Sequence, residues 1–281
     1  PSRGLGDVYK RQEGSAAVHT AGKLTLNEEQ EVEIAVSAYE ASLNLQIWKN
    51  YVDEIGVSVI HPGGTAIGPL QRIQGTQRFQ LGETNLLVYY GEPSPYNPYQ
   101  EIYLDFIPVG SYIDDGIWKI RLTPIRITDG AFDMWLPAGN VLNSGTGFLN
   151  PVEETTLTIP STATKVITVG AYDARFDQAA AFSGRGYTRA TNQVKPDLVA
   201  PGVEIMSCAP GGGYQVRTGT SMATPFVTGS AALLMQWGIV NGNDAYLYGE
   251  KMKAYLIRGA RRLPGCLLYT SPSPRDGATS R

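Results

Sequence analysis

The chain has 281 residues, of which 42% are hydrophobic and 17% charged, and its formal net charge at pH 7 is −3. This composition is typical of a globular protein with a sizeable core and argues against a disordered chain. The small negative charge argues against a nucleic-acid-binding surface. No apolar run has the length expected of a membrane span, and no signal peptide is visible. The two cysteines, Cys208 and Cys266, support neither a disulfide framework nor a zinc site.

Both ends of the chain are expected to lie outside the fold. Residues 1–12 (PSRGLGDVYKRQ) and residues 265–281 resemble translated sequencing-adapter read-through, so we exclude them from the fold prediction. Natural flexible tails are the alternative. On the first interpretation the chain is a piece of a longer gene product, and Cys208 is its one genuine cysteine.

Residues 22–157 show the pattern of short, half-buried strands. Hydrophobic residues alternate with polar ones, as at Val32, Ile34 and Val36, which is the two-residue period of a strand with one buried face. Turn residues such as Pro62-Gly63-Gly64 separate the strands. The predicted strands cover residues 31–37, 43–48, 57–60, 84–90, 101–107, 117–122, 126–128 and 132–136. Their spacing predicts an antiparallel β-sandwich, for which a jelly roll is one solution.

Tyrosines and acidic pairs in this segment allow more than one interpretation. Tyr89, Tyr90, Tyr96 and Tyr99 either form a carbohydrate- or peptide-binding face or, as we favour, pack the sandwich and stiffen a loop. The acidic pairs lack the oxygen ligands of a recognisable calcium loop, so we interpret them as turn or surface carboxylates and expect no metal site. These pairs are Asp53-Glu54 and Asp114-Asp115.

After residue 157 the pattern changes to longer apolar strands and helices. The β-branched run Val166–Gly170 predicts a buried parallel strand, and a shorter strand follows at residues 197–200 between two prolines. Two further strands, residues 205–208 and 214–216, flank a turn of three glycines. Hydrophobic residues at helical spacing predict a helix over residues 248–260.

The segment Gly219–Pro225 (GTSMATP) leads into a run without charges that ends at Trp237. Pro225 fits the first turn of a helix, and a helix that is apolar on every face is expected in a core. Ser221 then lies at the helix N-terminus, where backbone N–H groups and the helix dipole favour negative charge. Acyl transfer needs such donors for its oxyanion. The alternative is that Ser221 only caps the helix.

Four motifs in one order resemble the subtilisin-like serine protease family, peptidase S8. They are VITVGA (residues 166–171), FSGRG (182–186), KPDLVAPG (195–202) and GTSMATP (219–225). The resemblance covers roughly residues 159–264. It implies an α/β fold with part of the subtilisin-like three-layer parallel sheet, and it implies that Ser221 is the nucleophile. Phe226 stands where many members have a histidine that is not part of the triad. No cofactor is implied.

The resemblance also indicates which catalytic groups the chain lacks. In the family a Gly-Asn-x-Gly loop supplies a side-chain amide to the oxyanion hole; residues 13–21 resemble the end of that segment, with Gln12 in place of the asparagine. The catalytic Asp and His precede that loop, so we expect them to be absent. His19 is interpreted as a loop histidine and His61 as a strand-end histidine of the sandwich. Asp53 is not expected to orient a catalytic base.

The sandwich of residues 22–157 is then an insertion next to the catalytic segment of residues 158–264. This arrangement resembles clostridial spore germination proteases and related bacterial subtilases. The resemblance implies an extracellular, cell-surface or spore-associated protein of a bacterium. A parallel sheet without its first strands is expected to expose an edge.

We therefore expect the whole protein to be a serine endopeptidase acting on protein or peptide substrates through an acyl-enzyme on Ser221, with this chain inactive by itself. One alternative is a pseudoprotease or binding scaffold in which the upstream Asp or His is not functional. Another is a carbohydrate-binding module that acts through the sandwich. The oligomeric state is not predicted.

Overall fold

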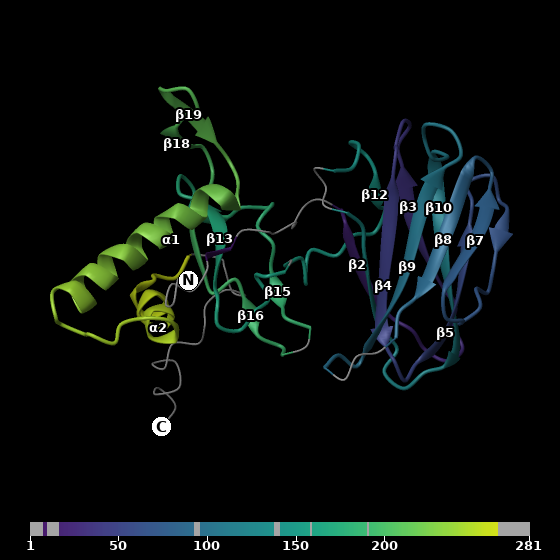
Figure 1. Cartoon of the computed structure of the whole chain (residues 1–281), viewed down its shortest axis with the longest axis horizontal. Coiled ribbons are helices and arrows are strands. Elements are labelled where there is room, and N and C mark those ends of the chain that lie inside the picture. The colour runs from purple at the N-terminus through teal and green to yellow at the C-terminus, as the bar shows by residue number, and fades with distance from the viewer. Residues whose placement is uncertain are drawn as a thin grey trace. The chain divides into compact units, whose positions relative to one another are not determined.

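The computed structural model describes residues 8–9, 17–92, 96–137, 141–157, 159–189 and 191–263 (Figure 1). The chain divides into two compact units. We call Ala16–Val152 the two-sheet unit, and Pro1–Ser15 with Glu153–Arg281 the Ser221 unit. The predicted tail of residues 265–281, and Gln12 with the proposed remnant at residues 13–16, lie outside the described residues.

The two-sheet unit consists of two antiparallel sheets. The six-stranded sheet contains, in spatial order, β2 (His19–Lys23), β11 (Ala131–Trp135), β4 (Leu43–Asn50), β9 (Tyr99–Pro108), β8 (Thr84–Tyr90) and β7 (Thr76–Leu81). The five-stranded sheet contains β12 (Gly147–Phe148), β3 (Gln30–Val36), β10 (Gly116–Arg126), β5 (Glu54–Ile60) and β6 (Ala66–Ile67).

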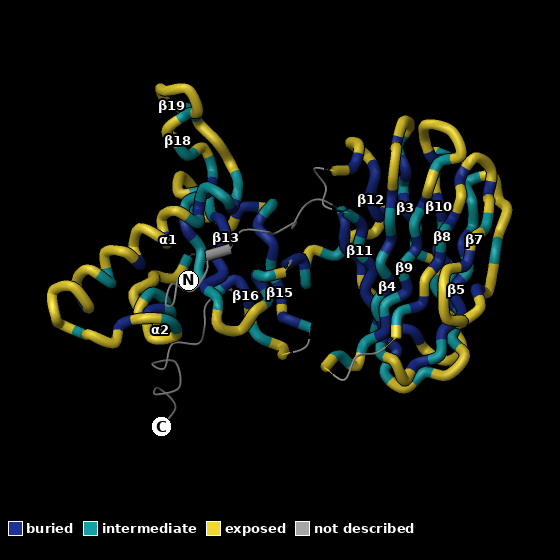
Figure 2. Tube along the Cα trace, in the orientation of Figure 1, coloured by how far each residue is buried: buried dark blue, intermediate teal, exposed yellow. Residues whose placement is uncertain are grey.

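One hydrophobic core lies between the two sheets, because every second residue of their strands points inward. This alternation of buried and accessible residues is visible along the strands of Figure 2. Leu43, Leu45 and Ile47 of β4 are buried, as expected for a strand with one core face. Trp118 of β10 is fully buried against Phe106, with ring centroids 5.1 Å apart, and its indole N–H donates to the Asp114 carbonyl at 2.8 Å. The largest core side chain therefore has its one polar group satisfied.

Most predicted strands of this unit are present, and the structure differs from the prediction in two ways. Residues 117–122 and 126–128 were expected to form two strands, but residues 116–126 form the single strand β10. Its register shifts between Pro124 and Arg126, since proline has no N–H for the ladder. Strands β2, β6, β7 and β12 were not predicted.

The boundaries of the two-sheet unit also differ from the predicted 22–157. Strand β2 pairs with β11 from His19 onward, so residues 19–21 belong to this unit and not to a remnant of the protease segment. At the other end the two-sheet unit stops at Val152, and the Ser221 unit resumes at Glu153. There the Thr156 N–H donates to the Arg185 carbonyl at 3.1 Å, which connects the segment to the rest of the Ser221 unit.

The Ser221 unit is built on parallel strands covered by helices. Strand β13 (Ile167–Asp173) pairs in parallel with β17 (Leu198–Pro201), which confirms the two parallel strands predicted here. The short antiparallel pairs are β14 (Gln178–Ala179) on β13, β15 (Gly186–Tyr187) with β16 (Val194–Lys195), and β18 (Ile205–Cys208) with β19 (Tyr214–Arg217). The helices are α1 (Thr220–Met235), the π-helical turn η1 (Gln236–Val240) and α2 (Glu250–Gly259).

Part of the N-terminal segment contributes to this sheet. Val8–Tyr9 forms strand β1, which pairs in parallel with β13 through Val8↔Ile167 and Tyr9↔Thr168. The expectation that residues 1–12 lie wholly outside the fold is therefore wrong at these two residues. The physical reason is the open edge of β13, whose unpaired N–H and C=O groups accept a further strand. The other residues of this predicted tail lie outside the described ones.

Helix α1 is not buried on every face, which corrects the prediction. Its buried residues are Thr220, Ala223, Val227 and Ala231, a stripe at helical spacing that packs on β13 and β17. Leu233 is 67% exposed and Trp237, in the following turn, is 46% exposed. The sheet contacts one side of the helix, and no other described element covers the opposite side (Figure 2).

The same helix bears on the expectation that no segment spans a membrane. Helix α1 with η1, Thr220–Val240, has 21 residues and a mean hydropathy of 1.2, enough by length and composition to cross a membrane. Length and composition therefore do not support that expectation, although core helices of soluble proteins meet the same criterion.

Asp53 connects two turns of the two-sheet unit. Its carboxylate is fully buried and accepts the backbone N–H groups of Thr128, Asp129 and Gly130 at 2.6, 3.0 and 2.9 Å. Asp53 is therefore a turn carboxylate, as one of the two expectations had it, and the expectation of a surface carboxylate is wrong for it. Burial by itself raises the pKa of this carboxyl, but the three N–H donors and the Lys49 ammonium outweigh it and hold the pKa below its ordinary value.

Replacing this carboxylate tests its role as an anchor. We expect Asp53→Asn to lower the free energy of unfolding of the two-sheet unit by about 2–4 kcal/mol, because buried N–H groups lose their charged acceptor. Urea denaturation followed by tryptophan fluorescence measures this. The difference from wild type is expected at pH 7 and to shrink as the pH falls below about 4, where the carboxyl of the unfolded chain becomes protonated. The exposed Asp115→Asn is the matched control and should change stability by less than about 0.5 kcal/mol.

Candidate active site

Ser221 lies in the first turn of α1, beside the carboxyl ends of the parallel strands. Tyr172, near the end of β13, accepts the N–H of Gly202 at 3.0 Å, and the Gly202 carbonyl accepts the N–H of Gly219 at 2.8 Å. Gly219 immediately precedes the helix. This relay of backbone hydrogen bonds connects the sheet to the start of α1. Crevices at the carboxyl ends of parallel strands are the usual place for active sites in α/β folds.

Two glycines make this close connection possible. A Cβ atom on Gly202 would lie 2.6 Å from the Cβ of Ala171 and 3.0 Å from the Gly219 carbonyl oxygen. Gly219 has φ +152°, a backbone conformation that L side chains rarely adopt. Larger residues at either position would displace the loop and with it Ser221.

The environment of Ser221 suits an attacking or oxyanion-stabilising role. The side chain is half-buried at the helix N-terminus, and the first turn holds no acidic residue. The Met222 N–H donates to the Gly219 carbonyl at 2.9 Å and closes the turn. Among the described residues the Ser221 hydroxyl has no hydrogen-bond partner. The positive end of the helix dipole favours an anion at this place.

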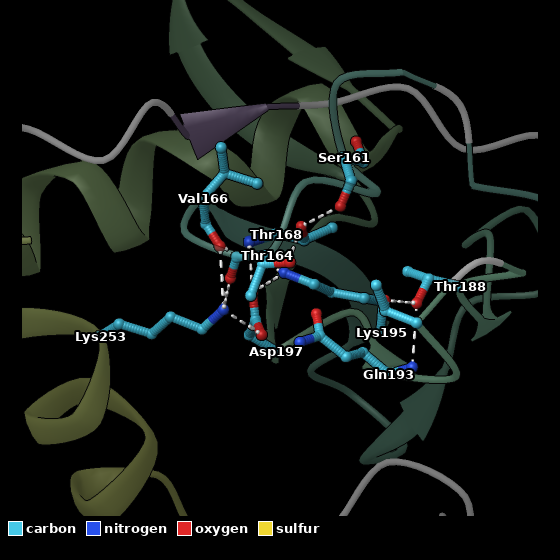
Figure 3. A network of polar contacts seen from close by, with 10 residues as sticks. Ser161, Thr164, Val166, Thr168, Thr188, Gln193, Lys195, Asp197 and Lys253 are labelled. Carbon is cyan, nitrogen blue, oxygen red and sulfur yellow. Dashed lines mark hydrogen bonds and ion pairs between the residues drawn. The ribbon is translucent and has the colours of Figure 1, made fainter. Parts of the chain in front are cut away.

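A buried polar network fixes the opposite, amino ends of the same strands (Figure 3). The Asp197 carboxylate accepts the Thr168 N–H at 2.8 Å, the Lys195 ammonium at 2.8 Å and the Lys253 ammonium at 2.7 Å. Both ammonium groups also donate to the Val166 carbonyl, Lys195 at 3.2 Å and Lys253 at 3.0 Å. Lys253 belongs to α2, so the network joins that helix to β13 and to the start of β17.

The network holds two cations around one buried anion. The Lys195 side chain is 1% exposed and that of Asp197 is 7% exposed. Burial lowers the pKa of Lys195; the Asp197 carboxylate offsets part of this effect, and the nearby Lys253 ammonium adds to it. Asp197 is therefore the group on which both ammonium groups depend. The KPD part of the third motif thus has a structural role at the end of the sheet opposite to Ser221.

Both histidines of the chain belong to the two-sheet unit, and each ring is engaged there. His19, predicted in a loop, lies in β2 and is buried; its Nε2 is 3.0 Å from Asp133 and its Nδ1 is 3.2 Å from the Val152 carbonyl. The His61 Nδ1 accepts the Gly63 N–H at 2.9 Å, and its Nε2 lies 3.1 Å from Asp114. His61 follows β5, as predicted for a strand-end histidine.

Three comparisons with known proteins bear on this site. The model of the subtilase family matches residues 136–277, just over half of the chain. The chain belongs to the subtilase family. The match begins before residue 158 and extends beyond residue 264, the predicted limits of the catalytic segment.

Known relatives of this subtilase are similar to parts of it. It is 46% identical over 77 residues to an intracellular serine protease of Paenibacillus polymyxa, covering 27% of this chain and 21% of that protein. It is 38% identical over 119 residues to the serine protease AprX of Bacillus subtilis, covering 35% of this chain and 26% of AprX. The subtilase chain thus spans about a quarter or less of these two relatives.

One solved structure is similar over nearly the whole subtilase chain. It is the CspB protease of Clostridium perfringens, with a TM-score of 0.83 and 36% sequence identity, covering 94% of this chain and 54% of that one. The predicted subtilisin-like fold is therefore confirmed, and the chain spans about half of the CspB chain.

Sequence reasoning missed several polar groups of this subtilase. Asp133, the partner of His19, gave no signal because it stands alone within the apolar strand β11. Lys253 was missed because it lies in a helix that was predicted only from its hydrophobic spacing, whereas its partner Asp197 is far away in the sequence. Lys195 and Asp197 were quoted as parts of a motif, and two opposite charges next to a proline, within a segment otherwise apolar, were the signal of a buried pair.

Removing the shared anion of the network tests its importance. We expect Asp197→Asn to destabilise the Ser221 unit by about 3–5 kcal/mol, because the buried ammonium of Lys195 and the half-buried ammonium of Lys253 lose their counter-charge. Loss of the helical circular dichroism signal in urea reports on this unit, since the described α-helices lie in it. Asp177→Asn is the control: Asp177 pairs with the exposed Arg261 at 3.3 Å, and its loss should cost less than about 1 kcal/mol.

Gly202 offers a second test, with another glycine as its control. We expect Gly202→Ala to destabilise the Ser221 unit by about 1–3 kcal/mol, because the new methyl group overlaps Ala171 and the loop before α1 has to move. Gly229, inside α1, has open space at its Cβ position, so Gly229→Ala should leave stability unchanged or raise it by about 0.5–1 kcal/mol. Equal losses for both variants would contradict the proposed role of Gly202.

Proposed function

We propose that Ser221 is the nucleophile of a subtilisin-like serine endopeptidase and that protein or peptide chains are its substrates. The proposal rests on the position of Ser221 in the first turn of α1, at the carboxyl ends of the parallel strands. Two backbone hydrogen bonds of Gly202, to Tyr172 and to Gly219, hold the start of the helix there; we call them the Gly202 relay. Family membership supports the same role, because the GTSMATP motif contains the residue that matches the family's nucleophile.

The proposed reaction follows from this geometry. The Ser221 oxygen attacks the carbonyl carbon of the scissile peptide bond, and a general base takes its proton. The oxyanion that forms lies near the positive end of α1, where donors stabilise it. The amine leaves with a proton from the base, and water then hydrolyses the acyl-enzyme to release the second product and restore the serine.

The general base is proposed to come from a part of the whole protein other than the described residues. Both histidines of the chain have ring nitrogens engaged inside the two-sheet unit, by Asp133 and Val152 for His19 and by Gly63 and Asp114 for His61. The Ser221 hydroxyl has no partner among the described residues. For this reason we propose that the chain by itself does not turn over peptide substrates.

We further propose that the two-sheet unit is a jelly-roll insertion within the protease domain. Its support is the connectivity: the chain changes sheets between β3 and β4, between β4 and β5, and again before and after β10. The Ser221 unit contains residues on both sides of it in sequence. In this proposal residues 13–15 and 153–264 are parts of one protease domain.

Replacing the nucleophile in the whole protein tests the proposed function. Ser221→Ala should lower kcat for an unstructured protein substrate, such as casein, by at least about 10³-fold, because only binding and oxyanion stabilisation remain. The loss known for subtilisin, a member of the same family, exceeds this lower limit. Ser230→Ala is the matched control on the same helix; its exposed hydroxyl donates to the Phe226 carbonyl at 2.9 Å, and activity should be unchanged.

The possible outcomes separate the alternatives. Hydrolysis by the whole protein that survives Ser221→Ala would contradict the assignment of the nucleophile. A whole protein that folds, binds peptides and never cleaves them would favour a pseudoprotease or binding scaffold. Turnover by this chain alone would contradict the proposal that its base lies elsewhere.

A further inference from the structure

The outer faces of the two sheets in the two-sheet unit carry charge in different ways. On the five-stranded sheet, acidic residues of β3 stand opposite basic residues of β10. Glu33 pairs with Lys119 at 3.0 Å, and Glu31 pairs with Arg121 at 2.7 Å. Cross-strand pairs of opposite charge stabilise a sheet, so the charges of this face are balanced within it.

The outer face of the six-stranded sheet has aromatic rings and carboxylates side by side. Along β9, residues 100, 102, 104 and 106 point into the core, so the intervening residues Glu101, Tyr103 and Asp105 point outward. The register places Trp48 of β4 opposite Glu101, and Tyr89 of β8 opposite Tyr103. We call these five residues the β9 face. Tyr89 is 43% exposed, so the face is open to solvent at its edge.

The two carboxylates of the β9 face have no counter-charge of their own. Neither Glu101 nor Asp105 forms an ion pair with a described residue, in contrast to Glu31 and Glu33. Burial raises the pKa of both carboxyl groups. Burial also raises the pKa of Tyr103, and the two carboxylates raise it further. The face therefore combines negative charge and partial desolvation with aromatic side chains.

We propose that the β9 face binds an extended polypeptide segment whose lysine or arginine side chains contact Glu101, Asp105 and the aromatic rings beside them. Such cations supply the missing counter-charge and are attracted by tyrosine and tryptophan rings. Glu101 and Asp105 are four residues apart on one strand, which corresponds to about 13 Å. An extended segment with two cationic residues four positions apart matches this spacing.

A neutral glycan is less well matched to the same face. Sugar rings stack on aromatic side chains, and hydroxyl groups donate to carboxylates, but neither supplies a positive charge. The unpaired Glu101 and Asp105 thus favour the basic polypeptide, and a glycan becomes an outcome of the test. The inference does not depend on the role of Ser221, which lies in the other unit.

The full chain with a labelled peptide provides the test. Fluorescence anisotropy at about 50 mM NaCl, where screening is limited, compares the peptides GSGKGSGKGSG and GSGQGSGQGSG. The lysine peptide should bind at least roughly tenfold more tightly, from two charge-assisted contacts. This comparison uses the wild-type protein, so it does not depend on the folding of any variant.

Variants then locate the binding site. The double variant Glu101→Gln/Asp105→Asn keeps the side-chain shapes and should weaken binding of the lysine peptide at least roughly tenfold. The control Glu31→Gln/Glu33→Gln removes the same charge from the opposite sheet and should change binding less than about threefold. Tyr103→Leu should weaken binding, whereas Tyr103→Phe, which keeps the ring face, should not.

Three results would overturn the proposal. Equal binding of the lysine and glutamine peptides would remove the role of charge. If both double variants lost affinity for the lysine peptide equally, the net charge of the protein and not the β9 face would attract the peptide. Binding of cello- or chito-oligosaccharides that Tyr103→Leu abolishes, without binding of the lysine peptide, would assign the face to glycans.

Discussion

The Ser221 unit depends on the contacts of one buried group, the carboxylate of Asp197. It receives one backbone N–H from β13 and two ammonium groups, from the segment before β17 and from α2. A buried carboxylate with these three donors fixes the amino ends of the parallel strands and the helix beside them (Figure 3). With those ends fixed, the carboxyl ends of β13 and β17 form a defined edge. The Gly202 relay then holds the start of α1, and so Ser221, at that edge.

The two units satisfy their polar groups in different ways. In the two-sheet unit Asp53, fully buried, binds three backbone N–H groups, and His19 pairs with Asp133. Carboxylates and histidines are common catalytic residues, but these side chains form contacts within the fold. In the Ser221 unit the serine hydroxyl is the polar group at the helix N-terminus without a partner among the described residues. The side chains of Asp53, His19 and Asp133 therefore stabilise the fold, whereas the Ser221 hydroxyl is available to react with a substrate.

Much of the fold could be predicted from the sequence where the physical signal is local. Alternation identified β3, β4, β8 and β9, and the β-branched run identified β13, because periodicity records which face is buried. The pairing of β1 with β13 could not be predicted, since it depends on an open edge and not on the sequence of Val8–Tyr9. The exposure of α1 was also missed, because composition shows that a helix is apolar but not what covers it.

The candidate site could be predicted only in part, because local sequence signals identify a motif but not the contacts that form between distant segments. Ser221 is recognisable from its motif. The backbone donors around Asp53 and the ion pair of Lys253 with Asp197 come instead from segments far apart in the chain. Contacts between distant segments leave little trace in local periodicity. They become visible only when the strands and helices are placed together.

The most direct test of the central claim is mass spectrometry after reaction with a fluorophosphonate, which modifies only activated serines. In the whole protein we expect a single adduct on the peptide that contains Ser221. In this chain by itself we expect no adduct, because the base that activates the serine is proposed to lie elsewhere. An adduct on another serine of the whole protein, with Ser221 unmodified, would contradict the account.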